Sequence, residues 1–349
     1  MQPDQLAFLR AAFDRFARVE APGLASPTYE ELSYGVSNDD DLLEIASHTR
    51  SHQPPPNMLF AAVQYLLLNG LDHPLAAHYP IISGEPRPLE PAYPQFREFC
   101  LEHRERIVEL ISTRLTQTNV VRRCTCLLPA FSIVCRETSS PLALIDLGAS
   151  AGLNLNFDRY AYSYQRDGRE ILRWGSDSAQ IRLEAELRGS GELPPIPPAI
   201  PVASRDGIDL DPVDLANPDQ HLWLRALIWP EHVERHQQLI DAATEFKDSD
   251  IRMHAGDAAR VLPALIESVS SDHALVVYST IALHQFPRES RQRIADTLAA
   301  ASAERLVWQI ALEGNDPELS ITRYRNGTGE TEMLASASPH GWWIEWRAN

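Results

Sequence analysis

The sequence predicts an α/β protein in which a mostly parallel sheet carries helices on both faces. Short apolar runs at Leu142–Leu147 and Ala274–Thr280 end in small or polar residues, as buried parallel strands do. Stretches with helical periodicity separate these runs, and such alternation is typical of α/β folds. The first third of the chain, by contrast, has helical periodicity almost throughout. We therefore expect a helical N-terminal domain followed by an α/β domain.

The helical domain is predicted to span residues 1–137 and to pack as a cap on the α/β core. Ser26 followed by Pro27 is typical of a helix N-terminus, because Ser caps the helix and Pro suits its first position. One long amphipathic helix is expected over about residues 95–116. The α/β domain then takes up residues 138–349.

Composition and charge limit the classes of function. The chain has 349 residues, of which 44% are apolar, and a formal net charge of −17. Such acidity disfavours binding to a phosphate backbone, which needs clustered Lys and Arg, so we expect no nucleic acid partner. The four Cys form no C-x-x-C pair. With neither a signal peptide nor an apolar run long enough for a bilayer, the sequence predicts a cytoplasmic protein that does not enter membranes.

The chain is organised around the end of the first predicted strand. Leu142–Leu147 carries one acid, Asp146, and is followed by Gly148, Ala149, Ser150, Ala151 and Gly152, which we call the small-residue turn. A strand that breaks into such a turn lets the backbone approach a ligand closely, and N–H groups before a helix can bind polar groups. The spacing is not the dinucleotide G-x-G-x-x-G. An ordinary tight strand-to-helix turn is the alternative interpretation.

A β insertion is predicted after this turn, over about residues 160–200, because alternating strands there are joined by Gly- and Pro-rich loops. The next strand ends in Gly-Ile-Asp-Leu-Asp-Pro. Asp209, with Asp206 and Asp211 as rivals, is a candidate functional acid at this strand end, and a carboxylate suits a ligand because it can accept two hydroxyl hydrogen bonds. The interval along the chain from the Gly-rich turn to this acid is longer than the usual 20 or so residues, and the predicted insertion would account for the extra length.

Two later strand ends supply further candidates. Asp257 and Ala258 follow the third strand, where Asp257 is either a ligand contact or the N-cap of the next helix. Ser279 ends the fourth strand, where a ligand crevice lies in an open α/β sheet. His284, just beyond it, is a candidate general base, although such a His more often caps or packs.

A metal site is not expected. His232 and His236 stand four residues apart on one predicted helix, but Val233 occupies the position of Glu in the H-E-x-x-H motif. We expect this pair to lie on a solvated helix face.

Taken in order, the motifs D-L-G-A-S-A-G-L-N, G-I-D-L-D-P and G-D-A resemble those of class I S-adenosylmethionine (SAM) methyltransferases. The whole chain also resembles a bacterial family of unknown function with that core and a helical N-terminal extension. The resemblance implies a Rossmann-like, mostly parallel seven-stranded sheet closed by a C-terminal hairpin. It also implies SAM as cofactor, with the small-residue turn at the methionyl moiety, Asp209 at the ribose and Asp257 at the adenine. Asn154 and Ser279 would line the pocket.

The expected activity is methyl transfer to a small molecule, which needs mainly orientation and a dry pocket. A SAM-consuming lyase or cyclase would use the same pocket and release methylthioadenosine. A non-catalytic SAM-binding protein would modify nothing, and a nicotinamide oxidoreductase would need a better G-x-G-x-x-G motif. The sequence indicates neither the acceptor nor the oligomeric state.

Overall fold

The computed structural model describes residues 2–246 and 249–347, and its contacts divide the chain into two compact units. A helical unit contains Met1–Thr118 and Leu215–Ile240, and a sheet unit contains Asn119–Asp214 and Asp241–Asn349. The division differs from the expected boundary at residue 137. The last helix before the sheet, α9 (Cys124–Thr138), belongs to the sheet unit because its contacts are with strands β4, β7 and β8.

The helical unit is built from short helices around an aromatic core. Phe60 lies at its centre, stacked on Tyr29 with ring centroids 4.5 Å apart and with the Phe13 ring 5.9 Å away. The first ten elements are α1 (Pro3–Arg15), the π-helical η1 (Phe16–Glu20), α2 (Ala21–Gly23), α3 (Pro27–Ser37), α4 (Asp40–Ala46), α5 (Pro55–Leu68), η2 (Pro74–His78), α6 (Pro80–Ser83), α7 (Tyr93–Glu102) and α8 (Arg104–Thr113).

Two predictions about these helices have clear outcomes. The cap at Ser26 is confirmed, since its side chain accepts a hydrogen bond from the Tyr29 N–H and Pro27 is the first helical residue. The single long helix over residues 95–116 is wrong, because it is divided into α7 and α8 at His103.

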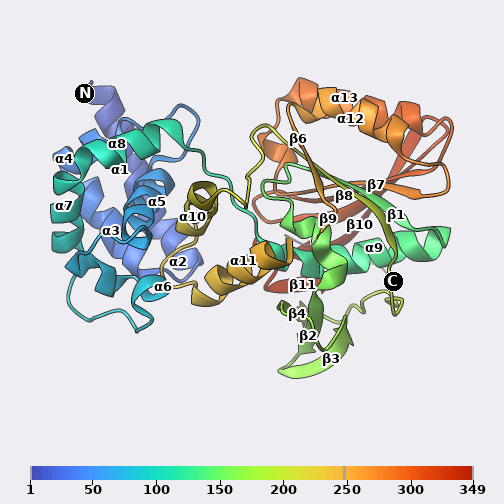
Figure 1. Ribbon diagram of the computed structural model, residues 1–349, viewed down its shortest axis with the longest axis horizontal. Helices are drawn as coiled ribbons and strands as arrows, with labels where there is room; N and C mark the ends of the chain where they lie inside the picture. Colours follow the sequence, from blue (N-terminus) through green and yellow to red (C-terminus); the bar gives the residue numbers. More distant parts are fainter. Residues whose placement is uncertain (1, 247–248, 348–349) are drawn as a thin grey trace. The chain divides into compact units, whose positions relative to one another are not determined.

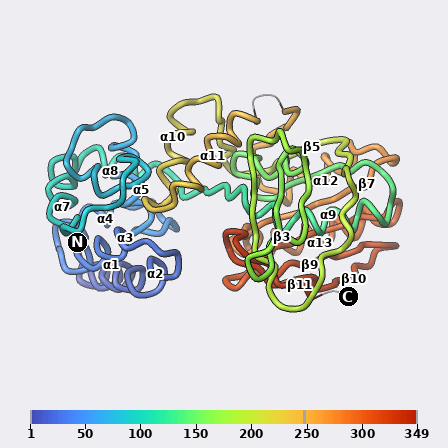
Figure 2. The backbone as a smooth tube through the Cα atoms, turned by 90° about the horizontal axis from the view of Figure 1, so that it is seen from below, coloured from blue at the N-terminus to red at the C-terminus, as the bar shows by residue number. Residues whose placement is uncertain are grey.

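A later segment of the chain completes the helical unit. Helix α10 (Pro218–Ala226) and the first part of α11 (Val233–Phe246), drawn in yellow, come long after the blue helices with which they form this unit (Figure 2). The buried Gln64 side chain on α5 donates to the Ala226 carbonyl at 3.0 Å. The Trp223 indole N–H donates to the Leu115 carbonyl at 2.8 Å. These hydrogen bonds tie α10 to the helices before the sheet.

In the described part of the sheet unit, eleven strands form a single mixed sheet. In sequence order they are β1 (Leu142–Leu147), β2 (Ala161–Arg166), β3 (Arg169–Trp174), β4 (Arg182–Arg188), β5 (Val202–Asp209), β6 (Arg252–Ala255), β7 (Ala274–Thr280), β8 (Val307–Glu313), β9 (Glu318–Arg325), β10 (Thr328–Ala337) and β11 (Trp343–Trp346). Their spatial order is β3-β2-β4-β11-β10-β9-β8-β7-β1-β5-β6. An α/β fold with a large, mostly parallel sheet is therefore confirmed.

The prediction of seven strands is wrong for two reasons. The insertion strands β2 to β4 join the main sheet, because β4 pairs in parallel with β11. Strand β10 was not predicted, because its first six residues are exposed and mostly polar. The C-terminal strands therefore follow β8 as the antiparallel run β9, β10 and β11.

Helices cover both faces of the parallel part of the sheet (Figure 1). Helices α12 (Ala258–Ser268) and α13 (Arg288–Ala301) pack with Ile145 of β1 and Val277 of β7 on one face. Helix α9 lies on the other face, where the Phe131 ring packs edge-on against Tyr278 at 5.3 Å. The 3₁₀ segment η4 (Leu153–Arg159), which follows the small-residue turn, contacts α9 and β5.

The order of the parallel strands determines where their loops separate. Strand β1 lies between β5 and β7, with β6 beyond β5 and β8 beyond β7, and between β1 and β5 the chain forms β2 to β4 at the far end of the sheet. The order of the parallel strands reverses between β1 and β7, since β5 and β6 extend the sheet on one side of β1 and β7 and β8 on the other; this is a topological switch point. In open α/β sheets this point is where ligands bind, outside the carboxyl ends of the strands. No helix in the described ranges is both long and apolar enough to cross a membrane.

Candidate functional site

The small-residue turn leaves the end of β1 with three residues in the left-handed region. Gly148, Ser150 and Gly152 have φ angles of 77°, 53° and 74°. The N–H groups of Gly148 and Ala149 both donate to the Ile208 carbonyl, at 2.8 and 3.1 Å, and the Gly152 N–H donates to Ala149. These N–H groups are thus bonded within the chain. The contribution of the turn to a ligand site lies in its small side chains more than in free donors.

Asp209 lies directly beside this turn. Its Oδ2 atom accepts a hydrogen bond from the Ser150 N–H at 2.8 Å, and its Oδ1 atom accepts one from the Asp211 N–H at 3.1 Å. The contact follows from the parallel pairing of β1 with β5, in which Asp146 faces Gly207. A carboxylate can accept several hydrogen bonds at once, which is the chemistry that a pair of ribose hydroxyls would use.

The rival Asp206 has a structural role. It is buried and accepts two hydrogen bonds from the Arg252 guanidinium, at 2.9 and 2.7 Å, and contacts His254 Nε2 at 2.8 Å. Burial opposes ionisation of Asp206, but the hydrogen bonds from Arg252 and His254 outweigh it and lower its pKa. With its oxygens bonded to β6, Asp206 is a poorer ligand candidate than Asp209.

Asp146 is a buried acid whose carboxyl group is incompletely hydrogen-bonded. Burial raises its pKa to about 7; the nearby Asp209 charge adds to the rise, while the Tyr278 hydroxyl and the Arg123 guanidinium oppose it. Neither Asp146 Oδ1 nor the Tyr278 hydroxyl has a hydrogen bond of normal geometry within the described ranges. A perturbed, incompletely paired acid at the end of a strand is a typical feature of functional sites.

Other buried polar groups around the turn also lack partners. Ser150 Oγ, Ser279 Oγ and both amide atoms of Asn156 make no hydrogen bond in the part of the chain that the structure describes. An unpaired buried polar group costs about 1–3 kcal/mol, and such groups in native proteins usually bind water or a ligand. Asn154, by contrast, is already partnered, because its Nδ2 donates to Thr280 Oγ1 at 3.5 Å.

Asp257 and Ala258 follow β6 at the same edge of the sheet. The Gly256 N–H donates to the Asp209 carbonyl at 2.8 Å, which joins this strand end to that of β5. The Asp257 side chain accepts the Ala259 N–H at 2.9 Å and so caps α12. The capping interpretation of Asp257 is thus observed, and a ligand contact stays a prediction. Ala258 is buried.

His284 follows β7 in a short 3₁₀ segment, η5 (Leu283–Gln285). Its Nδ1 atom lies 3.1 Å from Oε2 of Glu313, the last residue of β8. Glu313 is a residue of this region that the sequence motifs do not reveal. A signal existed, since Glu313 is an acid at the carboxyl end of an apolar strand, as Asp146 and Asp209 are.

The His pair on α10–α11 interacts with protein groups. His232 Nε2 lies 2.7 Å from the Leu24 carbonyl, and His236 Nε2 accepts a hydrogen bond from Arg225 at 3.1 Å. Burial lowers the pKa of His236 to about 4, so this imidazole is neutral at pH 7. Within the described ranges, no group of three or more His, Cys, Asp or Glu residues has the arrangement of a metal site.

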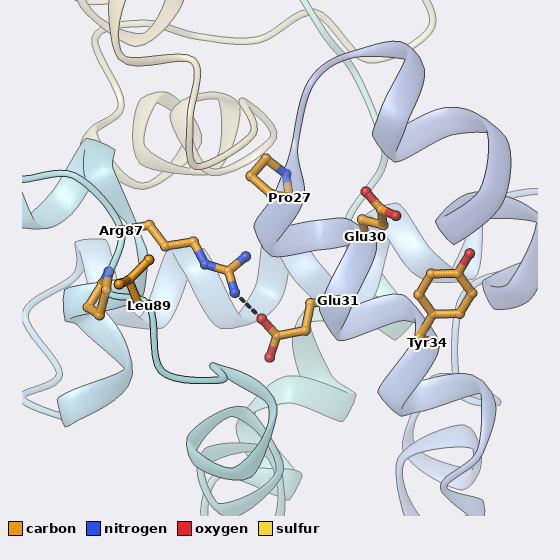
Figure 3. A pocket seen from close by; sticks show the side chains of 7 residues that line it. Pro27, Glu30, Glu31, Tyr34, Arg87 and Leu89 are labelled. Atoms are coloured by element: carbon orange, nitrogen blue, oxygen red, sulfur yellow. Dashed lines mark hydrogen bonds and ion pairs between the residues drawn. The ribbon is translucent and has the colours of Figure 1, made fainter.

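A surface hollow of about 540 Å³ lies in the helical unit (Figure 3). An ion pair between Arg87 and Glu31 crosses it. Its lining residues are Pro27, Glu30, Glu31, Tyr34, Arg87, Pro88 and Leu89. None of them is a predicted site residue, and the acidic side chains beside the single Arg indicate no specific ligand.

The fold and the site define an α/β protein with a small-residue turn, a buried acid and two further acids at the carboxyl edge of one parallel sheet. The chain belongs to the bacterial family described as "Uncharacterized protein conserved in bacteria (DUF2332)", whose profile matches residues 10–346. Neither the search of curated proteins nor that of solved structures found a match.

Proposed function

We propose that the sheet unit binds SAM at the carboxyl edge of β1, β5 and β6 and transfers its methyl group to a small molecule in the cytoplasm. The observation that carries the proposal is the contact between the Ser150 N–H and the Asp209 carboxylate. It joins a turn of small residues to a carboxylate at the end of the neighbouring strand β5. A carboxylate suits the ribose hydroxyls of SAM, and small side chains leave room for its methionyl moiety.

The unpaired buried groups support the same proposal. Asp146 Oδ1, Ser150 Oγ, Ser279 Oγ and the Tyr278 hydroxyl are buried at the ends of β1 and β7 or in the turn. A polar ligand bound at this edge would supply the hydrogen bonds that they lack. SAM has an ammonium group, a carboxylate and ribose hydroxyls, so its donors and acceptors suit these residues.

In this proposal each strand end has its own role. The small-residue turn, including Ala149 and Ala151, packs against the methionyl moiety, and Asn154 and Ser279 line the pocket. Asp209 accepts the ribose hydroxyls, and Asp257 with Ala258 lies at the adenine. SAM supplies an already activated methyl group, so the protein contributes orientation and exclusion of water. The net charge of −17 supports a small-molecule acceptor in preference to a nucleic acid.

Titration calorimetry with SAM, S-adenosylhomocysteine and NAD tests the cofactor. We expect SAM and S-adenosylhomocysteine to bind and NAD not to bind. Asp209→Asn should weaken SAM binding at least tenfold, because it removes a charged acceptor of the ribose hydroxyls. Asp211→Asn is the matched control: it makes the same change two residues away on an exposed side chain, and should leave the affinity nearly unchanged. Binding of NAD without SAM would refute the proposal.

Product analysis then distinguishes methyl transfer from the other SAM chemistries. Incubation with SAM and candidate acceptors should yield S-adenosylhomocysteine. Methylthioadenosine as the product would indicate a lyase or cyclase in the same pocket. SAM that binds and is never consumed would indicate a non-catalytic SAM-binding protein.

A further inference from the structure

The loop after β7 is held in an unfavourable backbone conformation. Ile281 has a φ of 54°, in the left-handed region that β-branched residues rarely adopt. Its N–H donates to the Leu312 carbonyl at 2.7 Å, which fixes the start of the loop to β8. Such strained residues are found mainly at functional sites, where surrounding contacts impose the conformation.

Glu313 holds the three residues that follow Ile281. Its Oε1 atom accepts the N–H groups of Ala282 and Leu283 at 3.1 and 3.0 Å, and its Oε2 atom accepts the backbone N–H of His284 at 3.4 Å. The same Oε2 lies 3.1 Å from His284 Nδ1. An ionised carboxylate only accepts hydrogen bonds, so Nδ1 of the neutral imidazole carries the proton. The lone pair of Nε2 is then available to act as a base.

This loop meets the small-residue turn at the switch point of the sheet. A Cβ atom built on Gly148 would lie 2.5 Å from the Ala282 Cβ, so only Gly at position 148 allows the two loops this close. The His284 side chain, two residues along from Ala282, is 40% exposed, so solvent or a substrate can reach it. The Arg123 guanidinium lies on the same edge, where it donates to the Thr280 carbonyl at 3.1 Å.

From these contacts we propose that His284 is the general base for the methyl acceptor, that Glu313 positions it, and that the acceptor is a small molecule with a phenolic or enolic hydroxyl group. The inference rests on the proposed function. A phenol has a pKa of about 10 and is mostly protonated at neutral pH, so its oxygen needs a base at the moment of transfer. An imidazole oriented by a carboxylate suits that task, as it does in hydrolase triads.

The proton and the electrons balance in this step. His284 Nε2 takes the hydroxyl proton while an electron pair of the acceptor oxygen forms the bond to the methyl carbon. The bond between sulfur and that carbon breaks, and its electron pair stays on sulfur. The products are a methyl ether and S-adenosylhomocysteine, and the imidazolium then releases its proton to solvent.

The test is an NMR titration of His284 in the SAM and S-adenosylhomocysteine complexes, with the signal assigned by its loss in His284→Gln. The two ligands differ by one methyl group and the sulfonium charge. If Nε2 is beside the transferred methyl group, that positive charge should lower the pKa of His284 in the SAM complex by about one unit. His273, in the same unit and before β7, is the control and should have equal pKa values in both complexes.

Glu313→Gln tests the positioning role. It keeps an oxygen that can cap the loop but removes the charge, so it should mix the two tautomers of His284, as seen in ¹⁵N shifts. A residue that only caps the loop would leave the tautomer of His284 unchanged. Equal pKa values of His284 in the two ligand complexes would overturn the proposal while leaving SAM binding intact. Failure of both ligands to bind would instead overturn the proposed function, and with it this inference.

Discussion

Replacing the buried Asp146 with Asn is expected to make the ligand-free protein more stable at alkaline pH. Burial raises the pKa of this carboxyl group from 3.8 to about 7. Between these two values the folded chain binds the proton more tightly than the unfolded chain does. The free energy of unfolding therefore falls as the pH rises, and it is level again above about pH 7.

The size of this effect follows from the two pKa values. A rise from 3.8 to about 7 corresponds to about 4 kcal/mol of unfolding free energy, lost between those pH values. Asn has nearly the same shape and cannot ionise, so Asp146→Asn avoids that loss. The gain in stability should be close to zero at about pH 4 and should grow to as much as about 4 kcal/mol at about pH 8.

Urea unfolding at several pH values, followed by the circular dichroism of the β-structure, measures this difference. Asp211→Asn, on an exposed side chain, is the control and should show no such pH-dependent gain. A variant that is less stable than the wild type at about pH 8 would refute the reasoning, because the ionised Asp146 would then have a favourable partner in the fold. If Asp146→Asn is more stable than the wild type but no longer binds SAM, Asp146 is retained for function at the expense of stability.

Two further substitutions test the geometry around the site. Gly148→Ala should lower the free energy of unfolding by about 2–4 kcal/mol, because it adds a Cβ atom 2.5 Å from that of Ala282 at a φ of 77°. Gly168→Ala is the control: this residue has a φ of 73° but no atom within 4 Å of the added Cβ, so the loss should be about 1 kcal/mol. Thermal unfolding compares the two variants, and equal losses of stability would contradict the close contact at Gly148. Arg205→Met should destabilise the protein by about 3–5 kcal/mol, because it leaves the Asp158 carboxylate without two hydrogen bonds, at 2.7 and 2.6 Å, from the Arg205 guanidinium. A double-mutant cycle with Asp158→Asn should show strong coupling between the two residues. Additive effects of the two substitutions would mean that the ion pair contributes little to stability.

The proximity of Asp209 to the small-residue turn could be predicted from the sequence. The carboxyl ends of adjacent parallel strands meet at one edge, and the prediction needed only the recognition that residues 160–200 are an insertion. The structure has this insertion as strands β2 to β4 and brings the Asp209 carboxylate to the Ser150 N–H. The position of Asp209 was predictable because it depends only on the order of the strands along the chain.

The contacts of Glu313 could not be predicted in the same way. They join the end of β8 to a loop about 30 residues earlier, and the pattern of apolar residues carries no information about that pairing. Strand β10 was missed for a related reason: residues 328–333 are exposed, so they lack the apolar alternation of a half-buried strand. The break at His103 also has no local signal, since neither Gly nor Pro accompanies it.

Hydrogen exchange with and without SAM tests the central claim most directly, because it shows where on the chain the ligand acts. We predict slower exchange of backbone amides in residues 148–154 and 209–211 and in the loop after β7 when SAM is added. Asp209→Asn should remove most of that protection, and residues 27–34, beside the surface hollow, should not respond. Protection confined to the helical unit, or none at any SAM concentration, would contradict the assignment of this sheet edge as the ligand site.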